Sequence, residues 1–282
     1  TAEPDDIIVS SDIRRKVQTL FELEPRGEVA LKGKSNLVPI FQIVGPRAMP
    51  EPLYGLKGMH SPLVGRQAEW EALLMTVDHL VSGRGQIVSV TGEAGLGKSR
   101  LVAELHEISK TSKDFKGLRW VEGRCLSYTE SVSFRPFHEV VQHLVGIRPD
   151  DAEAEAWSKL REALREGVSQ EKTAFALPYL ANFLNLRIEG DLLDKVRHLD
   201  AEALQRCTFV AISTLIETQT SPEFPLVLVL EDIHWMDQAS LALLEYLMPL
   251  ANRMPLMLLL VYRAERTKGC WRIWERAIRE FP

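Results

Sequence analysis

Residues 92–99 of the chain read GEAGLGKS. This stretch follows QIVSVT at residues 86–91, a short apolar run with β-branched residues, and precedes a stretch at 99–110 whose apolar residues have helical spacing. The stretch itself has the form G-x-x-x-x-G-K-[ST], a pattern with a defined structure when a strand precedes it and a helix follows it. We therefore expect a strand, a glycine-rich loop and a helix, in that order.

A loop of this form is suited to binding phosphate groups, and the alternative is a plain glycine-rich turn with an exposed lysine. Glycines let the backbone turn tightly, so that several N–H groups point at phosphate oxygens, and the dipole of the following helix adds positive charge. Lys98 would pair with the β- and γ-phosphates of a nucleotide, and Ser99 would supply its hydroxyl to Mg²⁺. The nucleotide-binding residues predicted here are Gly92, Glu93, Ala94, Gly95, Leu96, Gly97, Lys98, Ser99 and Arg100.

A second candidate is the acidic pair Glu231 and Asp232, which follows the apolar run LVLVL at residues 226–230. At the carboxyl end of a parallel strand next to the loop strand, these carboxylates would face the phosphates. One would bind Mg²⁺, together with Ser99, and the other would orient or deprotonate the attacking water. Successive strand residues face opposite ways, so both can serve only if the strand ends there. The alternative is an acidic strand end that faces solvent.

Two arginines are further candidates, each with a surface arginine as the open alternative. Arg263 follows the apolar run at 256–262 and could reach the γ-phosphate and report its presence. Arg66 lies just before the first expected helix of this region and could line a pocket for the base. His234 and Trp235 are interpreted as core packing rather than as catalytic. The catalytic residues that we predict are Lys98, Glu231, Asp232 and Arg263.

The composition excludes several classes of protein. Lysine and arginine number 34 against 39 aspartates and glutamates, and the net charge of −5 argues against a basic nucleic-acid-binding surface. The longest apolar run, at 256–262, is far too short to cross a bilayer. Cys125, Cys207 and Cys270 form no CxxC pair, which excludes a disulfide framework and a cysteine-based zinc site. We expect a reducing, cytoplasmic compartment.

The chain divides at residues 45–61, a stretch rich in proline and glycine that interrupts helices and central strands and reads as a linker. Residues 1–44 predict a helix that starts at Ser11 or Asp12 and reaches Phe21, followed by two β-like stretches around a turn at 32–36. These elements bury little surface alone, so their apolar side chains need a partner.

Residues 62–282 alternate between apolar runs and amphipathic stretches. Apolar runs without polar alternation fit strands covered on both faces, as in a parallel α/β sheet. We expect an α/β fold with a mostly parallel sheet and a helical insertion. The expected strands are 86–91, 118–123, 226–230 and 256–262, and the expected helices include 99–110, 152–167, 173–186, 196–219 and, with Asp237 as its cap, 239–251.

Four motifs together resemble the core of the STAND ATPases, P-loop NTPases related to the AAA+ group. They are LVGR at 63–66, GEAGLGKSRL at 92–101, GRCLSY at 123–128 and LVLVLEDIHWMD at 226–237. The resemblance runs from about Ser61 to the end of the chain and implies ATP and Mg²⁺ as cofactors. Two departures stand out. Gln67 replaces the glutamate usual after the Gly-Arg, with Glu69 later, and the acidic pair is Glu-Asp where Asp-Asp or Asp-Glu is common.

The sequence at residues 9–43 resembles the last helix and strands of a class III adenylate/guanylate cyclase domain. In that family a lysine of the KGK turn, here Lys32, contacts the substrate triphosphate. The metal-binding aspartates of the family lie upstream of the matching part, so we do not expect cyclase activity. The combination resembles bacterial signalling proteins in which a cyclase domain precedes an ATPase and helical repeats. We therefore expect this chain, which starts at Thr1, to be a fragment of a longer protein. We also expect its ATPase core to be truncated at the C-terminal end.

The leading hypothesis is an ATP-binding, slowly hydrolysing switch module of a multidomain signalling protein. Its partners would be other domains of a longer chain or a separate protein, without a membrane or direct nucleic-acid contact. The alternative is a nucleotide-binding regulatory module without useful turnover, for example part of a transcriptional regulator, and a third hypothesis is an active cyclase. The preference for adenine over guanine, the oligomeric state and the physiological signal stay open.

Overall fold

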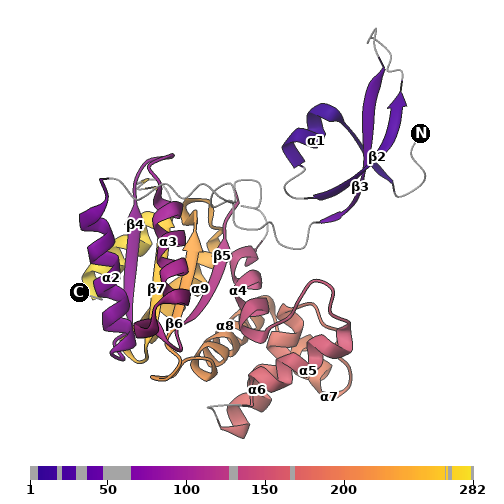
Figure 1. The fold of residues 1–282 in the computed structure, drawn as a ribbon. Helices are drawn as coiled ribbons and strands as arrows, with labels where there is room; N and C mark the ends of the chain where they lie inside the picture. Colours follow the sequence, from indigo (N-terminus) through magenta and orange to yellow (C-terminus); the bar gives the residue numbers. More distant parts are fainter. Residues whose placement is uncertain are drawn as a thin grey trace. The chain divides into compact units, whose positions relative to one another are not determined.

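The computed structural model describes residues 6–17, 21–29, 37–46, 65–126, 133–165, 169–263, 265 and 269–280. The chain forms two compact units, Thr1–Ser61 and Pro62–Pro282, which are described separately (Figure 1). Most of the predicted linker at 45–61 lies outside the described residues, and its first two residues belong to a strand of the first unit.

The first unit is a three-stranded antiparallel sheet in the order β1-β3-β2, with one short helix. Its elements are β1 (Ile7–Ser10), α1 (Ser11–Val17), β2 (Phe21–Val29) and β3 (Val38–Pro46). The predicted helix through Phe21 is too long, because Phe21 begins a strand in which Phe21 and Leu23 are half-buried and Glu22 and Glu24 are exposed. The predicted turn at 32–36, with Lys32, lies outside the described residues.

The second unit contains a sheet of four parallel strands in the order β4-β7-β6-β5. The expectation that β6 pairs directly with β4 is wrong, because β7 lies between them. β6 and β7 are buried along their whole length, so the two most apolar strands take the centre of the sheet. The strands are β4 (Gln86–Thr91), β5 (Arg119–Arg124), β6 (Leu226–Glu231) and β7 (Leu256–Tyr262).

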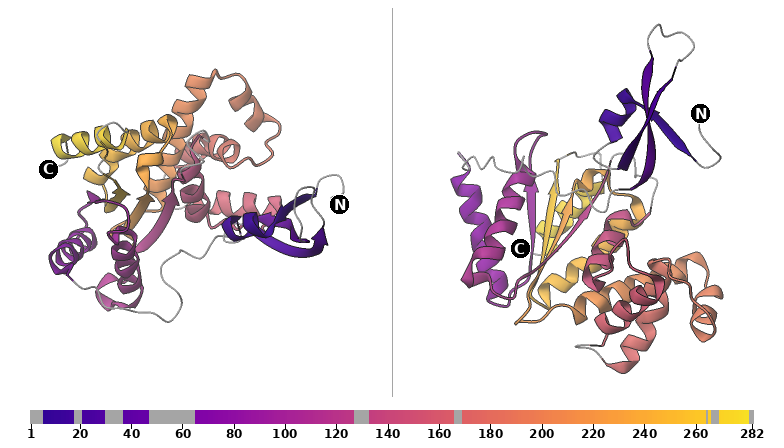
Figure 2. Two further views of the ribbon diagram at one scale, coloured as in Figure 1. Left: turned by 90° about the horizontal axis from the view of Figure 1, so that it is seen from above. Right: turned by 45° about the vertical axis from the view of Figure 1, so that its right-hand side comes forward.

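Helices cover both faces of this sheet. Alternate residues of β6 and β7, such as Val227 and Leu259, pack against α2 (Gln67–Val81) and α3 (Lys98–Thr111) on one face. The other residues of these strands pack against a larger core on the opposite face, formed with α4 (Arg135–Val145) and the later helices. Figure 2 shows α2 and α3, in purple, across the sheet from the orange and yellow helices. The result is the three-layer α/β arrangement predicted from the sequence.

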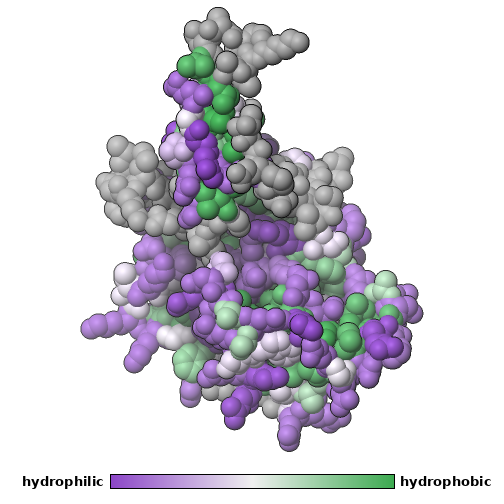
Figure 3. Space-filling view, turned by 90° about the vertical axis from the view of Figure 1, so that its right-hand side faces the viewer, coloured by the Kyte–Doolittle hydropathy of each residue, from purple (hydrophilic) through white to green (hydrophobic). Residues whose placement is uncertain are grey.

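A helical insertion between β5 and β6 follows α4. The stretch at 196–219, predicted as one helix, is divided between two helices. The carboxylate of Asp200 caps the second of them by accepting from the N–H of Ala203 at 2.7 Å. The helices are α5 (Glu153–Ala163), α6 (Gln170–Phe183), α7 (Asp191–Arg197) and α8 (Ala201–Thr218). On the face shown in Figure 3, hydrophilic side chains predominate and hydrophobic groups lie among them.

The chain after β6 returns to the sheet through short helical elements. Asp237 caps α9 (Gln238–Leu247), as predicted, by accepting from the N–H of Ser240 at 2.9 Å. The helix is shorter than predicted, because the chain continues at Pro249 as a 3₁₀ turn. The 3₁₀ elements are η1 (Lys113–Phe115), η2 (Ile233–Trp235) and η3 (Met248–Asn252).

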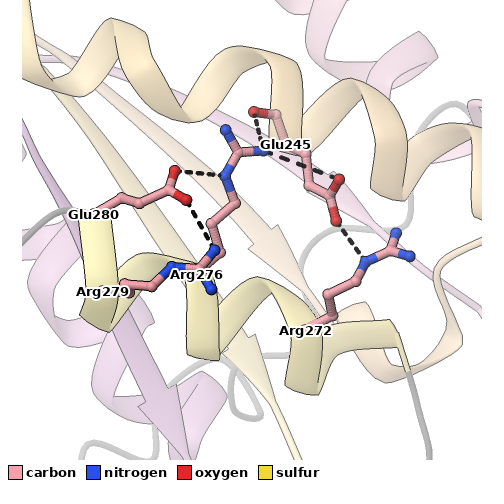
Figure 4. Close-up of polar contacts among 5 residues, drawn as sticks. All are labelled: Glu245, Arg272, Arg276, Arg279 and Glu280. Atoms are coloured by element: carbon pink, nitrogen blue, oxygen red, sulfur yellow. Dashed lines mark hydrogen bonds and ion pairs between the residues drawn. The ribbon is translucent and has the colours of Figure 1, made fainter.

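The final helix, α10 (Gly269–Glu280), is attached to α9 by ion pairs (Figure 4). The Glu245 carboxylate accepts from Nε of Arg272 at 2.6 Å, and the backbone carbonyl of Glu245 accepts from Nη1 of Arg276 at 3.2 Å. At the start of α10, the Sγ of Cys270 lies 3.8 Å from the carbonyl oxygen of Arg263. The helix is thus connected to the residue that directly follows β7.

Candidate nucleotide-binding site

The glycine-rich loop connects β4 to α3, as predicted. Gly95 and Gly97 have φ angles of 78° and 80°, in the left-handed region that glycine adopts without a steric penalty. Gly97 is the N-cap of α3, so the loop leads directly into the first turn of the helix. That turn leaves backbone N–H groups without an intrahelical acceptor, at the positive end of the helix dipole. The local structure therefore has the features of an anion-binding loop.

Lys98 lies across this loop. Its Nζ donates to the carbonyl oxygens of Gly92 at 2.7 Å and of Glu93 at 2.9 Å. Ser99 follows in the first turn of α3 and is half-buried, and the next residue, Arg100, is exposed. The ammonium group is therefore placed at the start of the loop, where it can exchange carbonyl oxygens for phosphate oxygens.

The acidic pair lies at the carboxyl end of β6. Glu231 is the last strand residue and is buried, whereas the side chain of Asp232 is about a third exposed. Asp232 has φ 56° and ψ 36°, a left-handed conformation that is strained for a residue other than glycine. The strand therefore ends after Glu231, which is the condition under which both carboxylates can serve one site.

Arg263 directly follows β7, which pairs with β4 on one side and with β6 on the other. Because parallel strands end at the same edge of a sheet, the half-buried Arg263 lies at the edge that also carries the loop and the acidic pair. Its backbone carbonyl accepts from the N–H of Glu265 at 2.8 Å. The fold thus brings Lys98, the acidic pair and Arg263 to one edge.

Arg66 joins the start of α2 to the loop. Its guanidinium donates to the carbonyl oxygen of Leu96 and to the carboxylate of Glu69, each at 2.8 Å. Glu69 lies three residues later, so it meets Arg66 across one helical turn although Gln67 takes the place usual for the glutamate. The backbone N–H of Glu69 and the Arg66 guanidinium lower the pKa of this carboxyl group.

A cavity of about 290 Å³ lies beside the loop. Arg66 and Glu69 line it together with residues of α2, β4 and the loop, among them Leu73, Val90 and Leu96. Its walls combine apolar side chains with the charged groups of Arg66, Glu69 and Lys98, and small-molecule sites usually combine the two kinds of group. The position of Arg66 in this wall is consistent with the predicted base pocket.

Arg124 was not among the predicted site residues. It ends β5 and is aligned with Glu231 in the sheet. Its Nη2 lies 3.5 Å from Oδ2 of Asp232, and its Nε lies 3.9 Å from Oε2 of Glu231. Its backbone N–H donates to the carboxylate of Glu139 on α4 at 3.1 Å. The signal available in the sequence was an arginine directly after a strand, in the GRCLSY motif.

His234 lies in η2, two residues after Asp232. The prediction of a buried side chain is confirmed, because His234 is only 3% exposed and its ring lies 5.1 Å from that of Trp235. Burial lowers the pKa of His234, while the charge of Asp232 opposes this shift. Within the part of the chain that the structure describes, neither ring nitrogen has a hydrogen-bond partner.

Comparison with known proteins places this geometry in a family. A profile of the AAA ATPase domain matches residues 62–261. The chain belongs to this family. The matched range of the AAA ATPase domain contains the loop, Arg124 and the acidic pair, and ends two residues before Arg263. The mixed α/β fold with a four-stranded parallel sheet agrees with a P-loop NTPase.

The AAA ATPase chain is also similar to a protein of Rhizobium meliloti that is described only as uncharacterised. The two are 21% identical over 260 residues, which is 92% of this chain and 24% of the relative. The chain therefore spans about a quarter of the length of that relative. Among the described residues, every helix is too short or too polar to cross a membrane.

Proposed function

We propose that residues 62–282 bind ATP with Mg²⁺ and act as a nucleotide-dependent switch module of a multidomain signalling protein. The observation that carries this proposal is that a phosphate-binding loop, an acidic pair and an arginine end at one edge of a parallel sheet in an AAA ATPase domain. Ligands of open α/β sheets bind at this edge. The match of 92% of the chain to 24% of a longer relative supports a multidomain context.

The donor set suits a magnesium nucleotide. Backbone N–H groups of residues 92–98 and the Lys98 ammonium would hold the β- and γ-phosphates, and the cavity next to Arg66 would take the base. The oxygen ligands available to Mg²⁺ are the Ser99 hydroxyl and the carboxylates of Glu231 and Asp232. When bound, Mg²⁺ would neutralise part of the phosphate charge.

Hydrolysis would require one carboxylate of the acidic pair to orient water toward the γ-phosphorus. The bond from the γ-phosphorus to the bridging oxygen then breaks, and ADP and inorganic phosphate are formed. Arg263, at the neighbouring strand end, would contact the γ-phosphate in the ATP state and lose that contact in the ADP state. Different contacts with two nucleotides are what a switch requires.

Titration with ATP and Mg²⁺ tests the proposal. We expect Lys98→Ala to weaken ATP binding by at least about tenfold, because a charge-assisted hydrogen bond to phosphate is lost. Lys110→Ala is a matched control, since Lys110 lies on the same helix but pairs with Glu107 on the exposed surface at 2.9 Å. Equal affinity of the wild type and Lys98→Ala would remove the basis of the proposal.

A second candidate is a regulatory module that binds nucleotide without useful turnover. The observation that favours it is the ion pairing of Arg124 with both carboxylates of the acidic pair. A carboxylate held by an arginine is less free to orient water. Phosphate release measured over many hours, with Asp232→Asn as the blank, separates the two candidates. Release above the blank supports the switch that hydrolyses ATP.

The finer assignment to the STAND class and to a cyclase-associated protein is also a proposal. It is supported by the EDIHWMD stretch at 231–237 and by the antiparallel sheet of the first unit. Cloning and sequencing of the coding region with its flanking DNA tests the assignment to a cyclase-associated protein. A cyclase core upstream and helical repeats downstream are the expected result.

A further inference from the structure

The imidazole of His234 is exceptional among the buried polar side chains. Both of its ring nitrogens are buried without a hydrogen-bond partner, and within the described part of the chain only the Thr220 hydroxyl shares this condition. By contrast, Nδ1 of His106 lies 3.3 Å from Glu122, and His138 has a hydrogen bond with the backbone of Phe183. Buried polar atoms in proteins are nearly always paired, so a residue with two unpaired nitrogens requires an explanation.

The position of His234 indicates where its partners lie. The η2 turn that carries it directly follows β6 and packs against β7 and α10, so the buried ring lies among these elements. The charged groups that act on the ring are Asp232, Arg263, Glu265 and Lys98. Three of these four belong to the proposed nucleotide site. The electrostatic surroundings of the buried ring therefore overlap with those of the proposed site.

An apolar residue would fill this position without the free-energy penalty of two unpaired nitrogens. A histidine at this position is compatible with the fold if its ring nitrogens gain hydrogen-bond partners in another state of the protein, such as a ligand-bound state. A neutral imidazole has one N–H donor and one acceptor nitrogen, so it can connect a carboxylate to a guanidinium. Asp232 and Arg263, the first two charged neighbours of the ring, are such a pair.

We propose that His234 is a positioning residue that connects Asp232 to Arg263 when ATP occupies the site. One ring nitrogen donates to the Asp232 carboxylate, and the other accepts from the Arg263 guanidinium. The arginine then faces the γ-phosphate with its orientation fixed relative to the acidic pair. With ADP, which has no γ-phosphate, Arg263 is not drawn into this arrangement. This inference rests on the proposed function, because it needs ATP at this edge of the sheet.

The test uses the full chain with Mg²⁺ and either ADP or the β,γ-imido analogue of ATP. Imidazole ¹H–¹⁵N spectra report hydrogen bonds to the ring directly. We expect the His234 ring nitrogens of the wild type to shift with the ATP analogue and to keep their positions with ADP. If the analogue binds and these resonances do not change, the inference is wrong. If neither nucleotide binds, the proposed function fails and the inference fails with it.

Variants give a second measurement. His234→Phe keeps an aromatic ring and removes both nitrogens, so we expect its preference for the ATP analogue over ADP to fall about tenfold. His234→Gln, which keeps a donor and an acceptor, should recover part of that preference. His138→Phe is the matched control on α4, where the ring stacks on Phe183, and we expect the wild-type preference. A wild-type preference in His234→Phe, with unchanged thermal unfolding, would overturn the assignment.

Discussion

Arg124 lies at the end of β5 with its Nη2 3.5 Å from Oδ2 of Asp232, so a guanidinium occupies the open side of the acidic pair. The side chain of Arg124 is 46% exposed, whereas that of Glu231 is 6% exposed. The arginine therefore lies between solvent and the buried carboxylate. Through its backbone N–H it is also connected to Glu139 on α4, the helix that precedes the insertion. The acidic pair is thus linked to α4 through Arg124.

Removal of this guanidinium should raise ATP turnover. We expect Arg124→Gln to increase phosphate release by up to about fivefold, because a half-exposed ion pair contributes at most about 1 kcal/mol and its loss frees the carboxylates. Arg206→Gln is the matched control, since Arg206 pairs with Glu202 on the exposed face of α8. Phosphate release under saturating ATP and Mg²⁺ is the measurement. A decrease in Arg124→Gln would instead assign the arginine a direct role in turnover.

The left-handed backbone of Asp232 predicts an unusual order of stability among its variants. The free energy of unfolding of Asp232→Gly should exceed that of Asp232→Ala by about 1 kcal/mol, because only the alanine variant keeps the steric strain. In the control at Asp78, inside helix α2 and exposed, glycine should be the less stable variant by a similar amount, about 1 kcal/mol. Urea unfolding measures both pairs. Phosphate release should be lost in Asp232→Gly and in Asp232→Ala.

Much of the fold could be predicted because its signals are local. The loop motif and the apolar runs predicted β4 and β7 with their observed bounds. The order of the strands could not be predicted, since nothing local to β6 shows that β7 separates it from β4. The break before α8 was missed for a different reason. The apolar period continues across Asp200, so the pattern shows no break there. The cap that begins α8 needs only the single carboxylate of Asp200.

In the candidate site too, local motifs could be predicted and contacts between distant segments could not. The positions of Lys98 and of the acidic pair follow from motifs that are continuous in sequence. Arg124 meets Asp232 only because β5 pairs with β6 in a register that aligns Arg124 with Glu231. Such a relationship between residues more than a hundred positions apart has no signature in a single sequence. The burial of His234 was predictable, but the lack of partners for its nitrogens depends on every element around it.

The ion pairs between α9 and α10 should stabilise the edge of the sheet that carries Arg263 (Figure 4). We expect Glu245→Ala to lower the free energy of unfolding by about 1 kcal/mol, because a partly buried carboxylate loses two arginine partners. Glu280→Ala, at the end of α10, is the control with a smaller effect, since Glu280 pairs only within its own helix among the contacts described. Equal losses in the two variants would contradict a special role for Glu245.

The pH dependence of stability should reveal the Glu122 contact between β5 and α3. Burial opposes the ionisation of Glu122, but hydrogen bonds from His106 and Trp120 outweigh it and lower the pKa of this carboxyl group below 4.5. A lowered pKa in the folded state stabilises the protein above the unfolded value of 4.5, and this stabilisation is lost as the pH falls through the folded pKa. Glu122→Gln should therefore be less stable than the wild type at pH 7, and the difference should shrink in acid. Urea unfolding from pH 7 down to pH 3 measures this, and a difference that stays constant over that range would exclude the ionised contact.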